Sequence, residues 1–380
     1  MATLQDILRT HLEATLANQH LSAPQIIAAR ALSVCRSAVL GGHVQRCPNG
    51  HEQRIWYNSC RHRACPQCNG LSRERWLSRI QARLIDCAHH HLIFTIDHQL
   101  NVLWRLNTAL MMNALFATVR DTLGELLGDP RYLGAQPGMV LALHTWGRSL
   151  SLHPHIHALV SDGGWDGERW VAPRRSHFLP ARVVMTLFRG KFLAELARLH
   201  RGGQLRLPDQ CSPERFGSLL NRLGRKKWNV HLQTRYSHGQ GVSRYLARYV
   251  KGGALSNRQI MRVSTHEVSF GYSAHGEDGA TKRTVMTLRP QQFIARVLMH
   301  APEPNRHTVR YLGLYAHGCT EALNQARAAH GQAKSEEPAP VTWQSFLERL
   351  RCPTRPDRCT QCGATLVRGA KIIARSGAPP

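Results

Sequence analysis

The segment between residues 41 and 70 limits the fold of this chain more than any other sequence feature. It has little apolar periodicity, but it carries four cysteines in the pattern Cys-x12-Cys-x4-Cys-x2-Cys. A polar segment that lacks a hydrophobic core of its own folds when a metal ion organises it, and the thiolates of a Cys-x-x-Cys turn are typical zinc ligands. We therefore predict a structural Zn²⁺ site at Cys47, Cys60, Cys65 and Cys68, with His51 as an alternative ligand.

A second group of cysteines lies near the end of the chain. Cys352, Cys359 and Cys362 have a spacing typical of zinc ribbons, but they supply only three ligands. The fourth would have to come from elsewhere, and Cys319 and His317 are the candidates. Because both groups contain a Cys-x-x-Cys pair, we favour metal binding over disulfides, as expected for a reducing compartment.

The charge of the chain indicates a polyanionic partner. Its 380 residues include 50 Lys and Arg against 24 Asp and Glu, which gives a formal net charge of +26. A folded surface with this excess favours nucleic acid and excludes a neutral surface suited only to small molecules. A GC-rich genome is an alternative source of the arginines. DNA is the partner that we expect first.

The sequence shows neither a membrane segment nor a secretory signal. No uninterrupted apolar run approaches the roughly 18 residues that a membrane span needs. The N-terminal sequence MATLQDILRTHLEATL lacks the charged and then apolar layout of an export signal. We expect a cytoplasmic, nucleoid-associated protein with no membrane partner.

Apolar periodicity alternates between strand and helix through the middle of the chain. Residues 91–96, 139–144 and 155–160 have the pattern of strands, and residues 101–127 and 181–200 have the pattern of helices. This alternation predicts an α+β fold with a mostly antiparallel sheet. The expected parts are a helical and zinc-binding N-terminal domain at 1–87, a central sheet domain at 88–265, a β-rich extension at 266–330 and a Cys-bearing tail at 341–380.

Three histidines are candidates for a metal site. His155 and His157 alternate along one predicted strand, so their side chains project from the same face while Ile156 points to the other. His144 lies on the preceding strand and would face them if the two strands pair. In a chain with 23 histidines, surface or core histidines are the alternative. Because the opposite face of the strand is apolar, we favour a divalent cation held by all three histidines over this alternative.

Two tyrosines are candidates for a nucleophile. Tyr245 and Tyr249 are four residues apart in the sequence RYLARYV, so a helix would place both phenols on one face. Arg244, Arg248 and Lys251 flank them and suit contacts with DNA phosphates. A phenol with an ordinary pKa near ~10 needs a neighbouring metal or base to attack a phosphodiester. The alternative is that the two rings only pack.

Several of these motifs together resemble a known family. The segments NSCRHRACPQC, HLIFTI, HTWGRSLSLHPHIH, HPHIHALVSDGG, YLARYVKGGALSNRQI, FIARVLMH and VRYLGLYAHG are similar to those of the HUH transposases of rolling-circle insertion sequences of the IS91 type. The similarity runs in matching order from about residue 40 to residue 320. The family's zinc segment commonly has a second cysteine where this chain has Gly50 followed by His51.

The resemblance implies a fold and a set of site residues. The fold is that of an HUH endonuclease, an RRM-like antiparallel sheet with flanking helices, accompanied by small zinc-binding modules. His155 and His157 correspond to the HUH histidines, and His144 has the place of the third histidine of related conjugative relaxases. Tyr245 and Tyr249 correspond to the two catalytic tyrosines.

The resemblance also implies an activity. It is that of a transposase that nicks and rejoins single-stranded or melted DNA ends through a 5′-phosphotyrosine, with Mg²⁺ or Mn²⁺ as catalytic cofactor and Zn²⁺ as structural cofactor. One alternative is a plasmid replication initiator or mobilisation relaxase with the same chemistry. Another is a non-catalytic zinc DNA-binding regulator.

Overall fold

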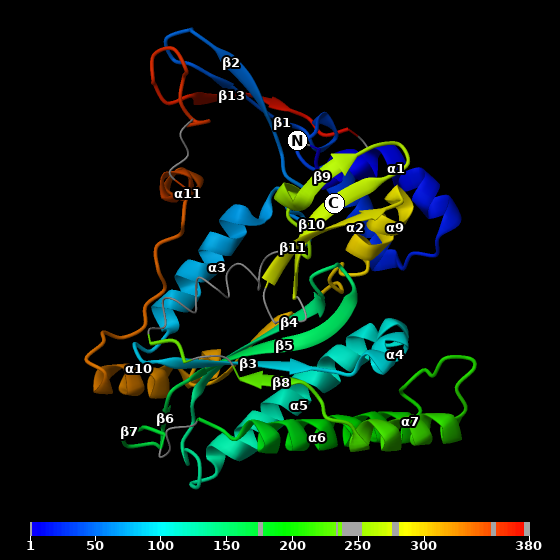
Figure 1. Cartoon of the computed structure of the whole chain (residues 1–380). Coiled ribbons are helices and arrows are strands. Elements are labelled where there is room, and N and C mark those ends of the chain that lie inside the picture. The colour runs from blue at the N-terminus through cyan, green and yellow to red at the C-terminus, as the bar shows by residue number, and fades with distance from the viewer. Residues whose placement is uncertain are drawn as a thin grey trace.

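The computed structural model describes residues 2–173, 178–232, 235–237, 253–275, 281–350 and 355–375. In this part of the chain a five-stranded antiparallel sheet, in the order β12-β4-β5-β3-β8, lies at the centre and helices flank it (Figure 1). This confirms the expected α+β architecture. The strands are β3 (His89–Thr95), β4 (Gly138–Trp146), β5 (Leu152–Ser161), β8 (Val230–Leu232) and β12 (Val309–Gly313).

Four helices belong to the layer that covers one face of this sheet. Apolar side chains at alternate strand positions, such as Leu92, Phe94 and Ile156, point into this layer and are fully buried. Phe188 packs edge-on against Phe94, with 5.1 Å between the ring centroids. Burial of these side chains fixes the central strands in place. The helices are α4 (Asn101–Leu106), α5 (Thr108–Gly128), α6 (Ala181–Arg201) and α7 (Pro213–Arg225).

The single helix expected over residues 101–127 is divided in two by Asn107. Its side-chain amide donates hydrogen bonds to the carbonyls of Leu103 and Arg206, and its side-chain oxygen accepts one from the Arg206 N–H. Asparagine forms such local bonds readily, so it competes with the helical hydrogen-bond ladder. Apolar periodicity continues through this position, which is why the break is not visible in the pattern.

The opposite face of the sheet is partly covered by α3 (Asn69–Arg83) and α10 (Thr320–Ala329). Trp76 and Ile80 of α3 pack in one core with Val140 and Leu159 of the sheet. Tyr315 follows β12 and is fully buried, with its hydroxyl 2.7 Å from His89 Nε2. The next positions on this face, toward one end of β4 and β5, carry histidines instead of apolar residues.

A second body, which we call the upper body, lies above the sheet and combines the beginning of the chain with a late segment (Figure 1). Leu8 and Leu32 share one core with Phe270 and Phe293. Elements from the expected parts 1–87 and 266–330 therefore fold against each other, together with β9 from the end of the expected part 88–265. The elements are α1 (Leu4–Asn18), α2 (Ala23–Ser33), β9 (Ile260–Val263), β10 (Val268–His275), β11 (Thr281–Leu288) and α9 (Pro290–Leu298).

A three-stranded sheet projects from this second body (Figure 1). Its strands are β1 (Gly42–Arg46), β2 (Gln53–Tyr57) and β13 (Val367–Ile372), which comes from the C-terminal tail and pairs antiparallel with β1. We call these strands, with residues 47–52 and 355–366, the arm. The remaining elements are α11 (Trp343–Arg349) beside α3, the hairpin β6 (Gly164–Trp165) and β7 (Trp170–Val171), and 3-10 turns at 38–40, 98–100, 257–259 and 317–319.

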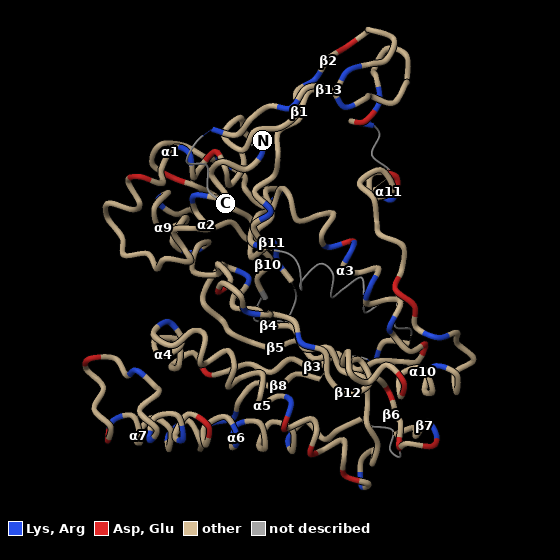
Figure 2. Tube along the Cα trace, turned by 180° about the vertical axis from the view of Figure 1, so that it is seen from behind, with Lys and Arg blue, Asp and Glu red and all other residues tan. Residues whose placement is uncertain are grey.

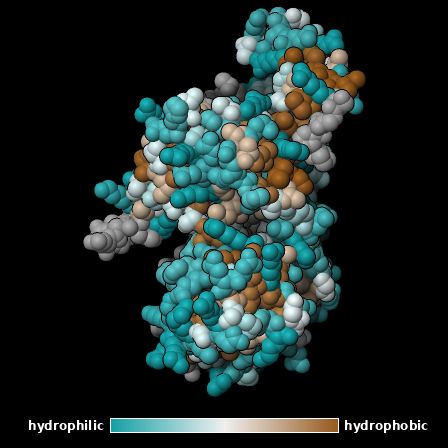
Figure 3. Space-filling model, turned by 90° about the vertical axis from the view of Figure 1, so that its right-hand side faces the viewer, coloured by the Kyte–Doolittle hydropathy of each residue, from teal (hydrophilic) through white to brown (hydrophobic). Residues whose placement is uncertain are grey.

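The side of the molecule seen in Figure 3 is mostly hydrophilic, with smaller hydrophobic areas in both bodies and near the arm. Exposed apolar residues on the arm include Ile55 and Val367, and Ile373 directly after the arm is also exposed. Among the described helices, none is both long and apolar enough to cross a membrane.

Two buried histidines, His89 and His300, make the stability of the fold sensitive to acid. Burial lowers the pKa of His89 to about 4 and that of His300 to about 4. Between pH 6.5 and 4 the unfolded chain therefore binds more protons than the folded chain, so stability is lost as the pH falls. We expect the free energy of unfolding to drop by roughly 2 kcal/mol per histidine between pH 7.5 and pH 5.

Urea unfolding at pH 7.5, 6 and 5 tests this expectation. The variants His89→Gln and His300→Gln remove one titrating group each, so the loss of stability between pH 7.5 and 5 should be smaller in each variant than in the unaltered protein. An equal pH dependence in all three proteins would show that other groups cause it.

Candidate metal centres

The three predicted histidines lie together on the face of the sheet opposite the main core. β4 and β5 pair antiparallel, and His144 is directly opposite His155 in this register. His157 is two residues further along β5, on the same face, opposite Ala142. All three side chains are buried, with exposed fractions of 2%, 8% and 5% for His144, His155 and His157. Their arrangement follows from strand alternation, as the sequence predicted.

The imidazole nitrogens of this group are close enough to share one ion. The three donor atoms lie within 4.8 Å of one another, and His155 Nε2 is 3.1 Å from His157 Nε2. Two nitrogens bound to one ion at about 2.1 Å are separated by roughly 3.0 to 3.5 Å. The His144 ring stacks on Trp146, with 4.6 Å between the centroids. The chemistry and the spacing of these donors fit a divalent cation.

Burial keeps two of the candidate ligands, His155 and His157, neutral. It lowers the pKa of His155 to about 4, and it lowers the pKa of His157 strongly, with further contributions from the neighbouring imidazoles. A neutral imidazole has a lone pair to offer, so the protein environment prepares these rings to bind a cation at neutral pH.

Two hydrogen bonds orient the candidate ligands. His155 Nδ1 lies 2.6 Å from the carbonyl oxygen of His153, so Nδ1 carries the proton and Nε2 faces the group. His157 Nδ1 lies 2.8 Å from Nε2 of His91 on β3. Sequence reasoning missed His91, which belongs to the run His89-His-His91 at the start of a strand. The available signal was strand alternation: Leu92 and Phe94 of β3 point into the main core, so His91 points to the opposite face.

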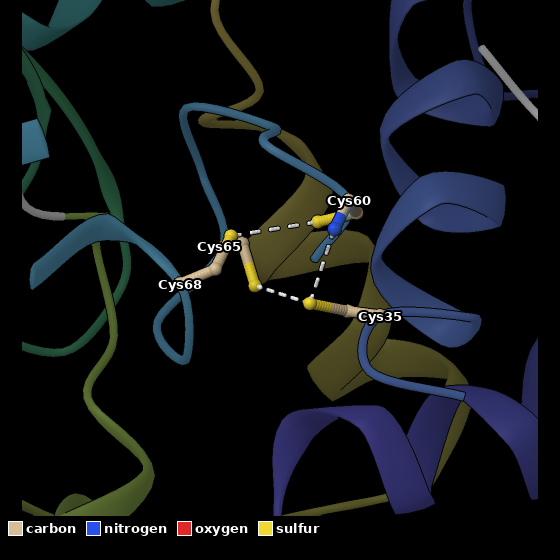
Figure 4. A group of neighbouring side chains, drawn as sticks. All are labelled: Cys35, Cys60, Cys65 and Cys68. Atoms are coloured by element: carbon tan, nitrogen blue, oxygen red, sulfur yellow. Dashed lines mark hydrogen bonds between the residues drawn. The ribbon is translucent and has the colours of Figure 1, made fainter. Parts of the chain in front are cut away.

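A second candidate centre consists of four cysteines in the upper body (Figure 4). Cys35 Sγ lies 3.6 Å from Cys65 Sγ, and Cys60 Sγ lies 3.7 Å from Cys68 Sγ. Sulfurs on one tetrahedral zinc ion are about 3.8 Å apart. Hydrogen bonds among the sulfurs lower the pKa of Cys35 and raise the pKa of Cys60, because the thiols share protons that a Zn²⁺ ion would displace.

The structure corrects the expected membership of this group. Cys60, Cys65 and Cys68 are in it, but the fourth member is Cys35 rather than Cys47 or His51. Cys35 follows α2, 25 residues before Cys60, and the apolar pattern around it is typical of a core cysteine. Cys35 and Cys65 are also buried in the core that joins α1 and α2 to β10 and α9, so the group sits inside the upper body.

Cys47 and His51 lie in a third group on the arm, together with Cys359 and Cys362 of the tail. This corrects the expectation that Cys319 or His317 completes the C-terminal group. His317 packs against the ring of Tyr311, and Cys319 precedes α10. Cys352 lies outside the described residues. Hydrogen bonds, the largest contribution coming from the N–H of Ala364, lower the pKa of the Cys362 thiol to about 6.

The other predicted site residues fall outside the part of the chain that the structure describes. They are Tyr245, Tyr249, Arg244, Arg248 and Lys251. Their roles therefore remain predictions from the sequence.

Comparison with known proteins identifies two family models along the chain. A transposase zinc-binding domain matches residues 7–96, and a family described as "Putative transposase" matches residues 138–322. The "Putative transposase y4qJ" of Sinorhizobium fredii is 35% identical over 359 residues, which cover 91% of this chain and 89% of that protein. The chain belongs to the IS91 family of transposases.

Two further proteins match parts of the chain. The transposase for insertion sequence element IS801 of Pseudomonas savastanoi is 30% identical to this transposase over 349 residues, which cover 89% of this chain and 82% of that protein. A metal-bound structure of the conjugative relaxase TrwC in complex with oriT DNA aligns over 43% of this chain and 71% of that chain, with 14% identity and a TM-score of 0.24.

The zinc-binding family model and the thiol-rich groups of this transposase together support Zn²⁺ as a cofactor. The model spans residues 7–96, which contain all four cysteines of the upper group as well as Cys47 and His51. Cys359 and Cys362 lie outside both family models.

Basic residues recur along α3, which runs from the cysteine group of the upper body to the central sheet (Figure 2). Arg75 and Arg79 are exposed, and Arg83 is half-buried, with its guanidinium donating to the Ala316 carbonyl. Trp76 and Ile80 occupy the buried side of the same helix. Arginines therefore recur along the outer side of α3, with Glu74 among them.

Proposed function

We propose that this transposase nicks and rejoins DNA strands at transposon ends through a 5′-phosphotyrosine intermediate, in rolling-circle transposition. The observation that carries the proposal is the convergence of three buried imidazoles on the face of the central sheet. A divalent cation bound there would withdraw charge from the scissile phosphate and stabilise the negative charge that develops on it.

The chain's own residues perform the remaining steps. His144, His155 and His157 would hold the cation, while the His153 carbonyl and His91 orient two of these rings. The phenolic oxygen of Tyr245 or Tyr249 loses its proton to solvent and forms a bond with the phosphorus atom. The bond from phosphorus to the 3′ oxygen breaks, and this oxygen leaves as a hydroxyl after taking a proton.

The covalent intermediate allows the strand to be rejoined without a nucleotide cofactor. The phosphotyrosine bond retains a reactive phosphodiester, so a 3′-hydroxyl attacks it and releases the tyrosine. A second tyrosine would let the enzyme cut another strand before the first one is released.

Single-stranded or locally melted DNA is the substrate that we propose. The formal net charge of +26 suits binding to the phosphate backbone, and the exposed Arg75 and Arg79 lie on α3, which leads from the cysteine group toward the sheet. Binding to DNA would also place the protein at the nucleoid.

The test is formation of a covalent adduct with labelled single-stranded transposon ends. Denaturing electrophoresis should show a protein-bound label with Mn²⁺ or Mg²⁺ and none after chelation. Because imidazole nitrogens suit Mn²⁺ better than Mg²⁺, we expect Mn²⁺ to act at the lower concentration. Specific binding of the ends without any adduct, in the presence of either cation, would favour a non-catalytic regulator instead.

We further propose that Cys35, Cys60, Cys65 and Cys68 hold a structural Zn²⁺ ion. Replacing Cys35 with serine should remove one zinc per chain and lower the free energy of unfolding by about 4 kcal/mol or more, the range in which the loss of a metal falls. Metal analysis and urea unfolding measure the two effects. The matched control is Cys211→Ser, at a half-buried thiol outside all three metal-ligand groups. Unchanged zinc content in Cys35→Ser would disprove the assignment.

A further inference from the structure

The arm has almost no hydrophobic core. Its buried cluster consists of Cys47, Cys359 and Leu366, with Ala364 packed against it. Two of these three buried residues are cysteines, so burial of apolar side chains cannot account for the order of the arm. Small modules of this kind are usually stabilised by a metal ion or by disulfides.

Four side chains meet at this cluster from the two ends of the sequence. Cys47 Sγ lies 3.5 Å from Cys362 Sγ, although 315 positions separate them in the chain. His51 Nδ1 lies 3.8 Å from Cys47 Sγ and 4.0 Å from Cys359 Sγ. These separations are those of ligands around one tetrahedral zinc ion, for which sulfur–sulfur distances are about 3.8 Å. A disulfide would leave the imidazole contacts with two sulfurs unexplained.

The two ligand-bearing turns have the same backbone design. The N–H of Cys47 donates to the carbonyl five residues later, at Glu52, and the N–H of Cys359 donates to the carbonyl five residues later, at Ala364. Each turn contains a glycine in the left-handed region, Gly50 with φ +79° and Gly363 with φ +71°. Such turns aim the side chains of their first and last ligands at a common point.

Polar contacts also connect the two turns. The Glu52 carboxylate accepts a hydrogen bond of 2.6 Å from the N–H of Thr360. The side-chain amide of Asn49 donates to Cys362 Sγ at 3.5 Å, a contact that favours a thiolate. The turns are therefore held face to face, with their four candidate ligands between them.

We propose that Cys47, His51, Cys359 and Cys362 bind a second Zn²⁺ ion, which fastens the C-terminal tail to the N-terminal hairpin. The ion would cross-link segments more than 300 residues apart, so it would keep β13 paired with β1. Loss of the ion would release the tail from β1 while the first zinc group, in the upper body, remains. The inference does not depend on the nuclease function.

The experiment counts zinc in the purified full-length protein by native mass spectrometry. The unaltered chain should carry two zinc ions and Cys362→Ser one. His51→Ala should release one zinc to a chelator at least about 10-fold faster than the unaltered protein. The matched controls are Cys319→Ser and Cys352→Ser, which should keep two. A single zinc in the unaltered protein, or two in Cys362→Ser, would overturn the proposal, and so would loss of one zinc in Cys352→Ser.

Hydrogen exchange gives a second, independent reading. In Cys362→Ser the amides of β13 and β1 should exchange at least about 10-fold faster, because the pairing of the tail then depends on a sheet without a core. The amides of β4 and β5 should keep their protection, which shows that the rest of the molecule is folded. Unchanged protection of β13 in a variant that has lost one zinc would show that the ion does not fasten the tail.

Discussion

Replacing His157 with alanine is expected to lower the rate of DNA nicking at least about 1,000-fold, which corresponds to about 4 kcal/mol of transition-state stabilisation. His157 is one of the three ligands of the proposed catalytic site. Its Nε2 lies 3.1 Å from Nε2 of His155, and its Nδ1 lies 2.8 Å from Nε2 of His91. Without it the cation would have two ligands at most from this group. Affinity for DNA should change little, because phosphate contacts from many basic residues carry the binding.

The matched control for this substitution is His153→Ala. His153 lies on the same strand and its side chain is exposed; its backbone carbonyl accepts from His155 Nδ1, and its ring centroid lies 5.2 Å from that of His155. The carbonyl survives the substitution, so nicking should stay within about 3-fold of normal, as expected for a surface change outside the site. The rate is measured with labelled single-stranded ends and Mn²⁺, and affinity by fluorescence anisotropy. A normal rate in His157→Ala, with the metal still required, would place the cation elsewhere.

His91 should have an intermediate effect. It contacts the ring of His157 and orients it, so its loss resembles the removal of an outer-shell partner, which typically costs 10-fold to 100-fold in activity or metal affinity. His91→Gln keeps a group that accepts a hydrogen bond and should retain more activity than His91→Ala. The concentration of Mn²⁺ needed for half-maximal nicking should rise in His91→Ala, a change that a purely structural role would not produce.

The histidine group could be predicted from sequence because it depends on local rules. Alternation along a strand places His155 and His157 on one face, and pairing of consecutive strands brings His144 opposite them. The same rules explain why Ile156 lies in the main core. His91 was within reach of this reasoning, but its role depends on the neighbouring strand β3, whose register the sequence does not specify.

The cysteine groups could not be assigned from spacing alone. A tetrahedral site needs four ligands close in space, and spacing reveals only those that share a turn, such as Cys65 with Cys68 or Cys359 with Cys362. Cys35 joins its group because the end of α2 packs beside the turn at Cys65. Cys47 joins the tail because β13 pairs with β1. Both depend on long-range packing that no local pattern encodes.

Tyr245 and Tyr249 are each expected to form a covalent DNA adduct, and the variant with both replaced by phenylalanine is expected to form none. One helical turn would separate the two phenols, so both would reach one phosphate bound at the histidine group. Phenylalanine keeps the ring and removes the nucleophilic oxygen, so packing should survive while nicking falls by at least about 1,000-fold in the double variant.

Peptide mapping of the trapped adducts separates this mechanism from its competitors. Tyr236 provides the matched control because its ring lies 6.3 Å from that of His91, close to the proposed metal site. Tyr236→Phe should form adducts normally, and its failure to do so would identify a different nucleophile. If all adducts map to one of Tyr245 and Tyr249, and the phenylalanine variant of the other completes strand transfer, the enzyme uses a single nucleophile. In that case the second tyrosine serves packing or base stacking, and the histidine group still defines where the phosphate is cut.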